Sequence, residues 1–420
     1  MSNRARCAGV LAMTLLLPAF DARAQQAEGR LEAALQDPAV AASLEHLREE
    51  RRATAELLVA MGTIVSPSGA EHDRADFVAE QMRAIGLQDV QVTASPNAVG
   101  VIPGRSEGHL VFVSTLDDLA TVAEHQRSAG APPSISGDRV LGPGTNTSVT
   151  TAAMLAAADA YLSSGQRPEH TLVFAAVAQE ETGLIGMREL FDRYGDSAEA
   201  FIEILGDGHS ISYGALGIHW WRIVATGPPG HTLGGGLPNV NQAIGRSVDR
   251  ILSLPNAQRG DDTRTRINIS MLDSGSVFNH KPESGWFSLD LRSMEAHILD
   301  EMEEDIRQII TQVAAETAID LEMEPVQLTP GGQIPGAAES RLVTSAAAIS
   351  RWLGYEPRMS DSGSSNMNIA VAAGVPAIGL GGSRGGDRGT PDEWADIDGL
   401  MRTARQVVLL SVLLGGHDEN

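Results

Sequence analysis

The sequence predicts an α/β fold in which a mostly parallel sheet is covered by helices on both faces and a smaller, ferredoxin-like α+β domain is inserted. Short apolar runs alternate along the chain with stretches of helical spacing. Partway along, this alternation gives way to the order strand, helix, strand, strand, helix, strand, which is the split-βαβ pattern. The chain has 420 residues, 42% of them hydrophobic. Because a single core rarely grows that large, two domains are expected.

The first 24 residues have the features of a secretory signal peptide. Arg4 and Arg6 precede an apolar run, residues 7–20, that is too short to span a bilayer, and small residues lead to a cleavage site after Ala24. A buried N-terminal helix is the alternative. Cleavage would remove Cys7, the only cysteine, so the mature protein would contain no disulfide. We expect a periplasmic or secreted protein.

Three apolar runs in the first half of the chain are predicted as buried parallel strands: residues 109–116, 170–178 and 200–207. Stretches of helical spacing at residues 74–86 and 148–164 precede and separate them. Each strand ends in polar residues. Because a parallel sheet has its site at the carboxyl ends of its strands, we expect these polar residues to form the functional site.

The inserted lid or dimerisation domain is predicted to span residues 220–332, between two parts of the catalytic-type domain, residues 25–219 and 333–420. Its strands and helices are expected, in order, at residues 220–227, 241–254, 266–275, 284–293, 298–316 and 319–326. The parallel sheet is expected to resume near residues 376–382. A glycine-rich bend, GLGGSRGGDRG, follows.

The formal net charge is −23 at pH 7. This sign argues against nucleic acid or an anionic membrane as the partner. We therefore expect a small-molecule ligand.

Nine short motifs occur in an order that covers nearly all of the mature chain: STLDD, GPGTNT, AQEETG, LGDGH, GPPGHT, GSVFN, LDLRS, GSSNMN and GGDRGTPDEW. In this order, and with the inserted domain, the sequence resembles the co-catalytic dizinc exopeptidases, a family that includes aminoacylase, glutamate carboxypeptidase, peptidase T and succinyl-diaminopimelate desuccinylase. The resemblance implies a catalytic domain with two zinc ions beside a smaller lid domain that often dimerises.

Most positions that the resemblance assigns to the metals carry other residues. The His of the family's His-x-Asp motif falls on Thr115, although its Asp is kept as Asp117. The bridging Asp falls on Thr147, or on Asn146 if the turn is shifted by one. The C-terminal His falls on Gly389.

Only Glu181 and Asp207 remain, which leaves one carboxylate for each ion. A tight zinc site needs three or four ligands, and two adjacent zinc ions need a bridging anion. His209 and His280 are the candidates for replacement ligands. We expect no metal at the usual site and no cofactor.

The resemblance also implies catalytic roles. Glu180 matches the general base, and His231 and Asn279 of the lid help to polarise the scissile carbonyl. Arg292 grips a substrate carboxylate through its planar fork. Alternatively, His231 caps a turn and Arg292 pairs with an acid on a neighbouring strand. The remaining predicted site residues are Asp117 as a catalytic residue and Thr115, Asn146, Thr147 and Gly381 as substrate contacts.

Asp117, Glu180, Glu181 and Asp207 are expected to converge on one pocket shaped for two cations. Four uncompensated carboxylates cannot all stay ionised, because like charges and burial both raise the pKa of a carboxyl group. At least one is therefore expected to be protonated near neutral pH. Such a pocket could act as a general acid and base without metal.

Three functions remain open. The first is an enzyme acting on the amide bond of a small, carboxylate-bearing peptide-like or N-acyl amino acid substrate, by hydrolysis, acyl transfer or cyclisation. The second is a non-catalytic binding protein, and the third a metallohydrolase with replacement ligands. Thr115, Thr147 and Ser148 have no histidine or lysine at motif spacing to activate them as nucleophiles, and the latter two are expected to cap a helix. A homodimer through the lid is expected.

Overall fold

The computed structural model describes residues 8–255 and 263–416. Arg4, Arg6 and Cys7 of the predicted signal peptide lie outside the described residues. The chain divides into two compact units. The first comprises Met1–Tyr213, Ile334–Ala370 and Gly374–Asn420, and the second Gly214–Gln333 with Val371–Ala373. The predicted lid, residues 220–332, falls inside the second unit.

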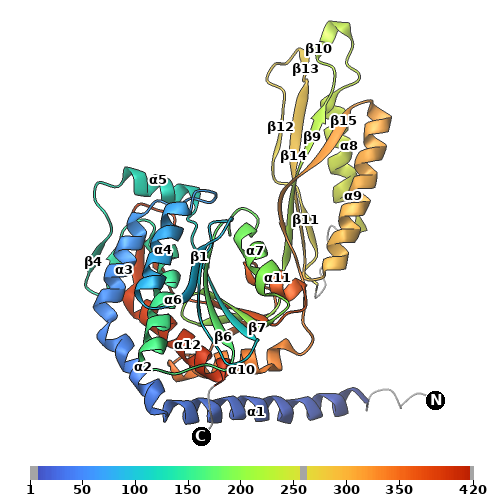
Figure 1. Cartoon of the computed structure of the whole chain (residues 1–420). Coiled ribbons are helices and arrows are strands. Elements are labelled where there is room, and N and C mark those ends of the chain that lie inside the picture. The colour runs from blue at the N-terminus through green and yellow to red at the C-terminus, as the bar shows by residue number, and fades with distance from the viewer. Residues whose placement is uncertain (1–7, 256–262, 417–420) are drawn as a thin grey trace, which may run out of the picture. The chain divides into compact units, whose positions relative to one another are not determined.

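The first unit contains an eight-stranded sheet in the order β1-β2-β6-β3-β7-β17-β8-β16 (Figure 1). Its central strands β6, β3, β7 and β17 are parallel, whereas β1 and β2 add antiparallel strands at one side. The predicted mostly parallel sheet is therefore confirmed. The strands are β1 (Gln88–Val92), β2 (Ala98–Ile102), β3 (His109–Thr115), β6 (Thr171–Val177), β7 (Ala198–Leu205), β8 (Ser210–Ser212), β16 (Arg358–Ser360) and β17 (Ala377–Gly381).

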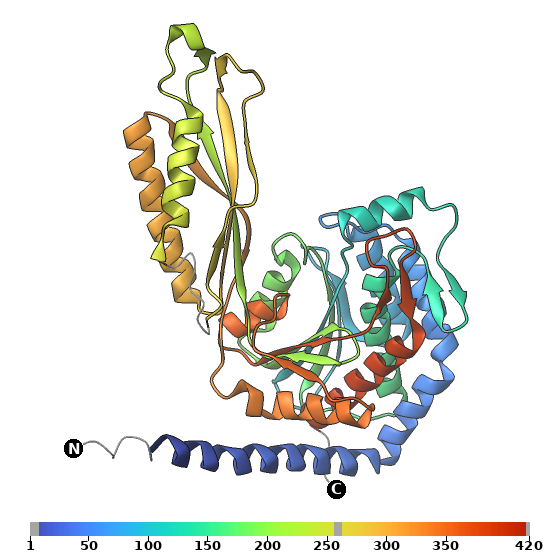
Figure 2. The ribbon, with the colours of Figure 1, turned by 180° about the vertical axis from the view of Figure 1, so that it is seen from behind.

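Helices cover both faces of this sheet. Figures 1 and 2 show α6 and α12 on one face and α7 on the other. The chain builds α6 largely from alanine and small polar residues, so it is buried almost throughout and packs closely against α3 and α12. The helices are α1 (Ala8–Leu35), α2 (Pro38–Glu49), α3 (Arg51–Thr63), α4 (His72–Ala84), α5 (Ala120–Ser128), α6 (Thr145–Ser163), α7 (Ile185–Tyr194), α10 (Arg341–Trp352), α11 (Met367–Ala372) and α12 (Ile397–Gly415).

A small antiparallel sheet in the order β18-β19-β5-β4 also belongs to the first unit. It brings the glycine-rich bend near the start of α6, because β18 belongs to that bend and β5 precedes α6 closely in sequence. Its strands are β4 (Ser134–Ser136), β5 (Arg139–Leu141), β18 (Gly385–Gly386) and β19 (Trp394–Asp396).

Helix α1 runs across Ala24, the predicted cleavage position. Ala27, Leu31 and Ala34, which follow that position, are buried in the core of the first unit. Among the described residues, no helix has the length and apolar character needed to cross a membrane. Export through a signal peptide remains a prediction.

The second unit is the ferredoxin-like domain that the sequence predicts. Its antiparallel strands have the order β11-β14-β9-β15, with β12 also paired to β14. Residues of α8 and α9 share a separate hydrophobic core with the sheet, which includes Ile223, Phe287 and Met302. The elements are β9 (Gly217–Thr226), α8 (Val240–Leu252), β11 (Arg266–Asn268), β12 (Leu272–Ser274), β14 (Ser284–Ser293), α9 (Ala296–Thr317) and β15 (Asp320–Thr329).

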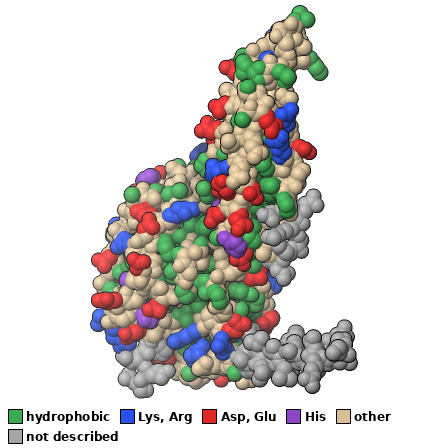
Figure 3. Space-filling model, turned by 90° about the vertical axis from the view of Figure 1, so that its right-hand side faces the viewer, with side chains coloured by type: hydrophobic (Ala, Val, Ile, Leu, Met, Phe, Trp, Pro, Cys, Tyr) green, Lys and Arg blue, Asp and Glu red, His purple; other side chains and the backbone are tan. Residues whose placement is uncertain are grey.

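One end of the second unit carries the short pair β10 (Gly230–His231) and β13 (His280–Lys281). Figure 1 shows this pair at one end of the unit, and exposed hydrophobic side chains gather there in Figure 3. They are Leu233, Leu237, Val277 and Phe278. Elsewhere on the face drawn in Figure 3, acidic and basic side chains are interspersed.

Candidate active site

Four parallel strands of the first unit end along one edge of the sheet. Thr115 at the end of β3 is paired with Val177 at the end of β6, and Leu205 at the end of β7 is paired with Gly381 at the end of β17. Since β3 also pairs with β7 in parallel, all four carboxyl ends lie on the same edge. The residues predicted from the strand ends of this unit therefore lie near one another.

Asp117 lies just beyond β3 and is 1% exposed. Its Oδ1 accepts the backbone N–H of Glu180 at 2.9 Å, and its Oδ2 accepts the N–H of Glu181 at 3.1 Å. The Ser68 hydroxyl donates to the same Oδ2 at 2.5 Å. Both carboxylate oxygens are thus used to hold the turn that presents Glu180 and Glu181. In this structure Asp117 positions the adjacent glutamates.

Glu180 is partly buried among other acids. Burial, together with the charges of Glu203, Glu181 and Asp117, raises its pKa well above the usual glutamate range, and the charge of Arg388 opposes this shift. This shift favours the protonated form of Glu180. A protonated carboxyl group can donate a proton, and it becomes a base once it has done so.

The free energy of unfolding is expected to depend on pH through Glu180. Because its folded-state pKa lies above that of the unfolded chain, stability is greatest below the ordinary glutamate range and falls as pH rises through the folded-state pKa. One such group contributes at most about 1.4 kcal/mol per pH unit. Urea unfolding between about pH 5 and 9 should show a smaller decline for Glu180→Gln than for the wild type. Equal declines would mean that another group is responsible.

Glu203 is a member of this cluster that the sequence reading missed. It lies within β7, is 1% exposed, and accepts the N–H groups of Asn366 at 3.1 Å and Met367 at 2.9 Å and the hydroxyl of Ser365. Burial raises its pKa, and these hydrogen bonds oppose the shift. Asn366 in turn donates to the Thr115 hydroxyl at 3.4 Å. Residues of the GSSNMN motif therefore donate hydrogen bonds to a buried acid, Glu203.

Two arginines of the glycine-rich bend enter the same cluster and were also missed. Arg388 forms an ion pair with Glu181, with Nη2 and Oε1 3.0 Å apart. Arg384 is partly buried, and its pKa is lowered to about 10 by burial and by Arg388, against the opposing charges of Glu180, Glu393 and Glu181. The prediction of uncompensated carboxylates was wrong, because guanidinium groups supply the compensating charge.

Asp207, the second remaining ligand position, has its own set of partners. It is fully buried and pairs with Nε of Arg402 at 3.0 Å and Nδ1 of His209 at 2.7 Å, while the Ser383 N–H donates to Oδ1 at 3.2 Å. The His209 ring stacks on Tyr355, whose hydroxyl donates to the Asp207 carbonyl. The Asp207 carboxylate is therefore engaged by an arginine, a histidine and a backbone N–H.

The start of α6 is capped by a carboxylate from a distant part of the chain. Glu393, 1% exposed, accepts the N–H groups of Gly144 and Asn146 through Oε1, each at 3.0 Å, and that of Gly389 through Oε2 at 3.0 Å. A carboxylate at a helix N-terminus is favoured by the unpaired N–H groups and the helix dipole. The expectation that Thr147 and Ser148 cap the helix was wrong: both lie within its buried first turn.

Asp118, which follows Asp117 directly in the chain, forms a buried ion pair. It pairs with Nη2 of Arg74 at 2.7 Å, and the two side chains are 0% and 1% exposed, respectively. Arg74 also donates to the Leu116 carbonyl at 2.8 Å and to the Ile64 carbonyl. This buried pair anchors the loop after β3 to helix α4.

These residues do not fit a pair of zinc ions. At the positions of the imidazole and bridging ligands lie Thr115, Thr147 and Gly389, none of which supplies a nitrogen or a carboxylate. Glu181 and Asp207 are each engaged by a guanidinium group. Within residues 8–255 and 263–416, no group of three or more His, Cys, Asp or Glu side chains could hold a metal ion. His209 pairs with Asp207, and His280 belongs to the second unit.

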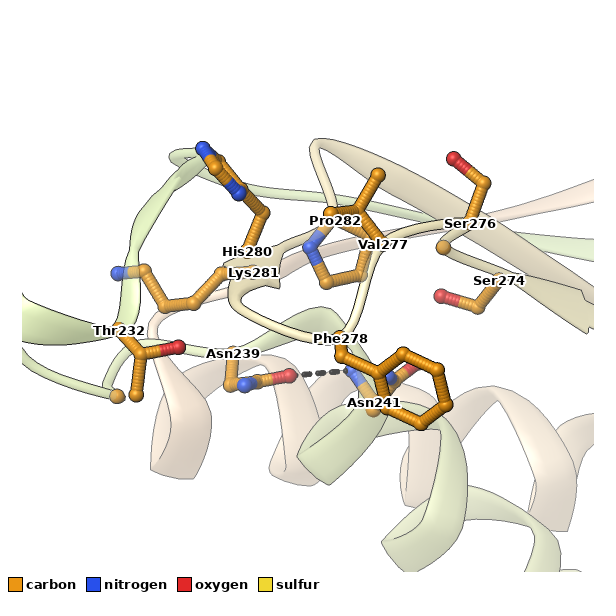
Figure 4. A pocket seen from close by; sticks show the side chains of 12 residues that line it. Thr232, Asn239, Asn241, Ser274, Ser276, Val277, Phe278, His280, Lys281 and Pro282 are labelled. Atoms are coloured by element: carbon orange, nitrogen blue, oxygen red, sulfur yellow. Dashed lines mark hydrogen bonds between the residues drawn. The ribbon is translucent and has the colours of Figure 1, made fainter.

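The second unit brings together the two predicted electrophilic residues. The Asn279 amide nitrogen lies 3.1 Å from Nε2 of His231, and His280 Nδ1 lies 3.0 Å from the Asn279 carbonyl oxygen. The His231 Nδ1 accepts the Leu233 N–H at 3.1 Å, so this ring does cap a turn. A pocket of about 460 Å³ lies beside them (Figure 4). Its lining includes Thr232, Asn239, Asn241, Phe278, His280 and Lys281.

Arg292, the predicted carboxylate anchor, is already paired. Its Nε and Nη2 donate to the Asp290 carboxylate at 3.0 and 3.1 Å. Both residues lie on β14, two positions apart, so the partner belongs to the same strand rather than to a neighbouring one.

Comparisons with known proteins identify the fold and the family. A family model described as Peptidase family M20/M25/M40 matches residues 116–411. No curated protein matches the chain. Aminopeptidase PepT from Bacillus cereus has a similar structure, with 18% identity, a TM-score of 0.68, and coverage of 86% of this chain and 97% of that chain.

Two further structures show the same likeness. A tripeptidase from Staphylococcus aureus has 19% identity and a TM-score of 0.70, with coverage of 86% of this chain and 97% of that one. An M20 family metallo-carboxypeptidase from Sulfolobus solfataricus has 13% identity and a TM-score of 0.68, with coverage of 85% and 98%. The structural likeness confirms the fold, and the family match, which extends over more than half of the sequence, shows that the chain belongs to peptidase family M20/M25/M40.

Proposed function

We propose that the protein is an exported amide-bond enzyme that acts on a small, carboxylate-bearing peptide-like or N-acyl amino acid substrate without a dizinc centre. Membership of the family supports hydrolysis of a peptide or amino acid amide. The metal-free chemistry is supported by the donor set, in which guanidinium groups engage the two remaining ligand carboxylates.

The observation that carries this proposal is the placement of Glu180. Asp117 fixes its backbone at the strand edge, and Glu203, Glu181 and burial disfavour its ionised form. An acid–base group works best when its pKa lies near the operating pH. Glu181, by contrast, forms an ion pair with Arg388.

The chemistry assigned to Glu180 is proton transfer at the amide. In hydrolysis, ionised Glu180 accepts a proton from water as the water oxygen bonds to the carbonyl carbon, and it returns that proton to the nitrogen as the C–N bond breaks. For His231 and Asn279 of the second unit, hydrogen-bond donation to a carbonyl oxygen is proposed from the resemblance alone. Acyl transfer or cyclisation would replace the water by another nucleophile and leave the role of Glu180 unchanged.

Metal content and chelation test the absence of a dizinc centre. Protein purified without chelator is expected to contain well below one equivalent of zinc by elemental analysis, because neither remaining carboxylate is free. Turnover in a screen of N-acyl amino acids and dipeptides is expected to be unchanged by chelator. About two equivalents of zinc, or loss of turnover on chelation, would reinstate a metallohydrolase.

A non-catalytic binding protein is the second candidate. It is favoured by Asp117, whose two oxygens hold backbone and hydroxyl groups rather than pointing to a free acid–base role. The Glu180→Gln variant separates the two functions, because a binder would keep its ligand whereas an enzyme would lose turnover.

The proposed location and oligomeric state are based on the N-terminal segment and on the second unit. We propose a periplasmic or secreted protein cleaved after Ala24, and a homodimer formed through the second unit, whose β10–β13 end exposes Leu233 and Phe278. N-terminal sequencing of the exported protein and sedimentation of the mature chain test these two points.

A further inference from the structure

Arg384 differs from three other arginines of the first unit in having no acidic partner within the part of the chain that the structure describes. Its guanidinium group forms no hydrogen bond or ion pair with any residue that the structure describes. Three other arginines of the first unit are each paired with an acid: Arg388 with Glu181, Arg402 with Asp207, and Arg74 with Asp118. The acids of those pairs are therefore engaged by other guanidinium groups, whereas Arg384 has no ion pair of its own among the described residues.

The acids near Arg384 are either engaged by other groups or disfavoured as anions. Burial and the neighbouring charge of Arg388 both act against its cationic form, and the nearby acids Glu180, Glu393 and Glu181 favour it. Glu181 is shared with Arg388, Glu393 accepts three backbone N–H groups, and Glu180 is disfavoured as an anion. A partly desolvated guanidinium group without its own partner gains the full strength of a charge-assisted hydrogen bond when an anion arrives.

The backbone that carries Arg384 is held in place. The Asp396 N–H donates to the Arg384 carbonyl at 3.0 Å, and the following strand β18 pairs with β19. Gly385 has φ +141°, and a Cβ atom there would come within 1.9 Å of the Trp394 carbonyl oxygen, so only glycine fits. Arg384 is thus presented from a fixed loop, which lowers the entropic cost of binding.

We propose that Arg384 binds the carboxylate of the ligand, at the edge of the sheet where the family places its metals, and so replaces Arg292 as the anchor expected from the resemblance. This inference rests on the proposed function in one point: the ligand is taken to be a small molecule that carries a carboxylate. A guanidinium group matches a carboxylate through two parallel N–H···O bonds. A singly charged carboxylate is favoured over a doubly charged phosphate, because Glu181 and Glu393 surround the group with negative charge.

Binding of three probes tests the inference without any turnover. The probes are N-acetylglycine, its neutral amide N-acetylglycinamide, and inorganic phosphate, measured by isothermal titration calorimetry on the mature protein. N-acetylglycine is expected to bind at least about tenfold more tightly than the amide, because the charge-assisted pair is lost in the amide. It is also expected to bind more tightly than phosphate. Equal binding of N-acetylglycine and the amide would overturn the inference, and tighter binding of phosphate would overturn the carboxylate assignment.

Variants assign the binding to one side chain. Arg384→Gln is expected to weaken N-acetylglycine binding at least about tenfold, and Arg384→Lys several-fold because the planar fork is lost. Arg127→Gln, a change of the same type at an exposed arginine of α5, is expected to leave binding unchanged. Unchanged binding in folded Arg384→Gln would overturn the inference, as would loss of binding in Arg292→Gln alone.

If the Arg384 variants fail to fold, the arginine side-chain NMR signals of the wild type give the same answer. The Arg384 signal is expected to shift on addition of N-acetylglycine and not on addition of the amide, and an unchanged signal would overturn the inference. Binding without turnover would contradict the proposed function alone. Turnover with N-acetylglycine binding that is indifferent to Arg384 would contradict this inference alone.

Discussion

Replacing Glu180 by glutamine is expected to lower kcat/KM on the amide substrate by about 10²- to 10⁴-fold, the usual contribution of a general acid–base group. Glutamine keeps the size of the side chain and cannot exchange a proton. The Asp117 hydrogen bond to the backbone at position 180 is independent of the side chain, so the turn should be preserved. Steady-state kinetics on the best N-acyl amino acid or dipeptide of the screen measures the effect.

The control for this change is Glu124→Gln, which removes an exposed carboxylate from α5. It is expected to leave kcat/KM unchanged, because Glu124 is not part of the acid cluster. If Glu180→Gln retained wild-type turnover, proton transfer by Glu180 would be excluded. If the wild type had no turnover but both variants bound the probe carboxylate equally well, the binding-protein alternative would stand.

Replacing Arg74 by methionine is expected to lower the free energy of unfolding by about 3–5 kcal/mol, the usual cost of leaving one charge of a buried pair alone. Arg74 and Asp118 are almost completely buried, so water cannot replace the lost partner. The carbonyl groups of Leu116 and Ile64 lose their donor as well. Urea unfolding of the mature protein measures the effect.

Two further variants show whether the unpaired charge is the cause. Arg83→Met changes an exposed arginine of the same helix and is expected to cost less than about 0.5 kcal/mol. The double variant Arg74→Met with Asp118→Asn removes both charges and should recover part of the loss. A double variant no more stable than Arg74→Met would show that the packing of the arginine, rather than the charge of Asp118, is responsible.

The sequence was sufficient to predict the fold of the first unit and that of the second. Strand β3, for example, is an uninterrupted apolar run that ends in polar residues, and α9 has clear helical spacing, so local pattern and burial agree in both. The first turn of α6 was misread because its cap comes from Glu393, which is far away in the sequence and leaves no local signal.

The site was predicted in part. Asp117 was identified because it follows the end of a strand, and parallel strands bring their carboxyl ends together, whereas Glu180 was identified through the family resemblance. Arg384 and Arg388 were missed because they belong to a glycine-rich bend, where charged residues usually contact solvent. Glu203 did leave a signal: it is an ionisable residue inside a buried strand, and such a residue needs partners or a function.

The conformation of Gly389 bears on whether a histidine could occupy the position that the resemblance assigns to the C-terminal metal ligand. Its φ is +83°, and its N–H is held by Glu393. A histidine reintroduced at this position would be forced into the left-handed region, at a cost on the order of 1 kcal/mol or more. It would gain nothing from zinc until a second and a third ligand had also been restored. The single substitution Gly389→His is therefore expected to be unfavourable by itself.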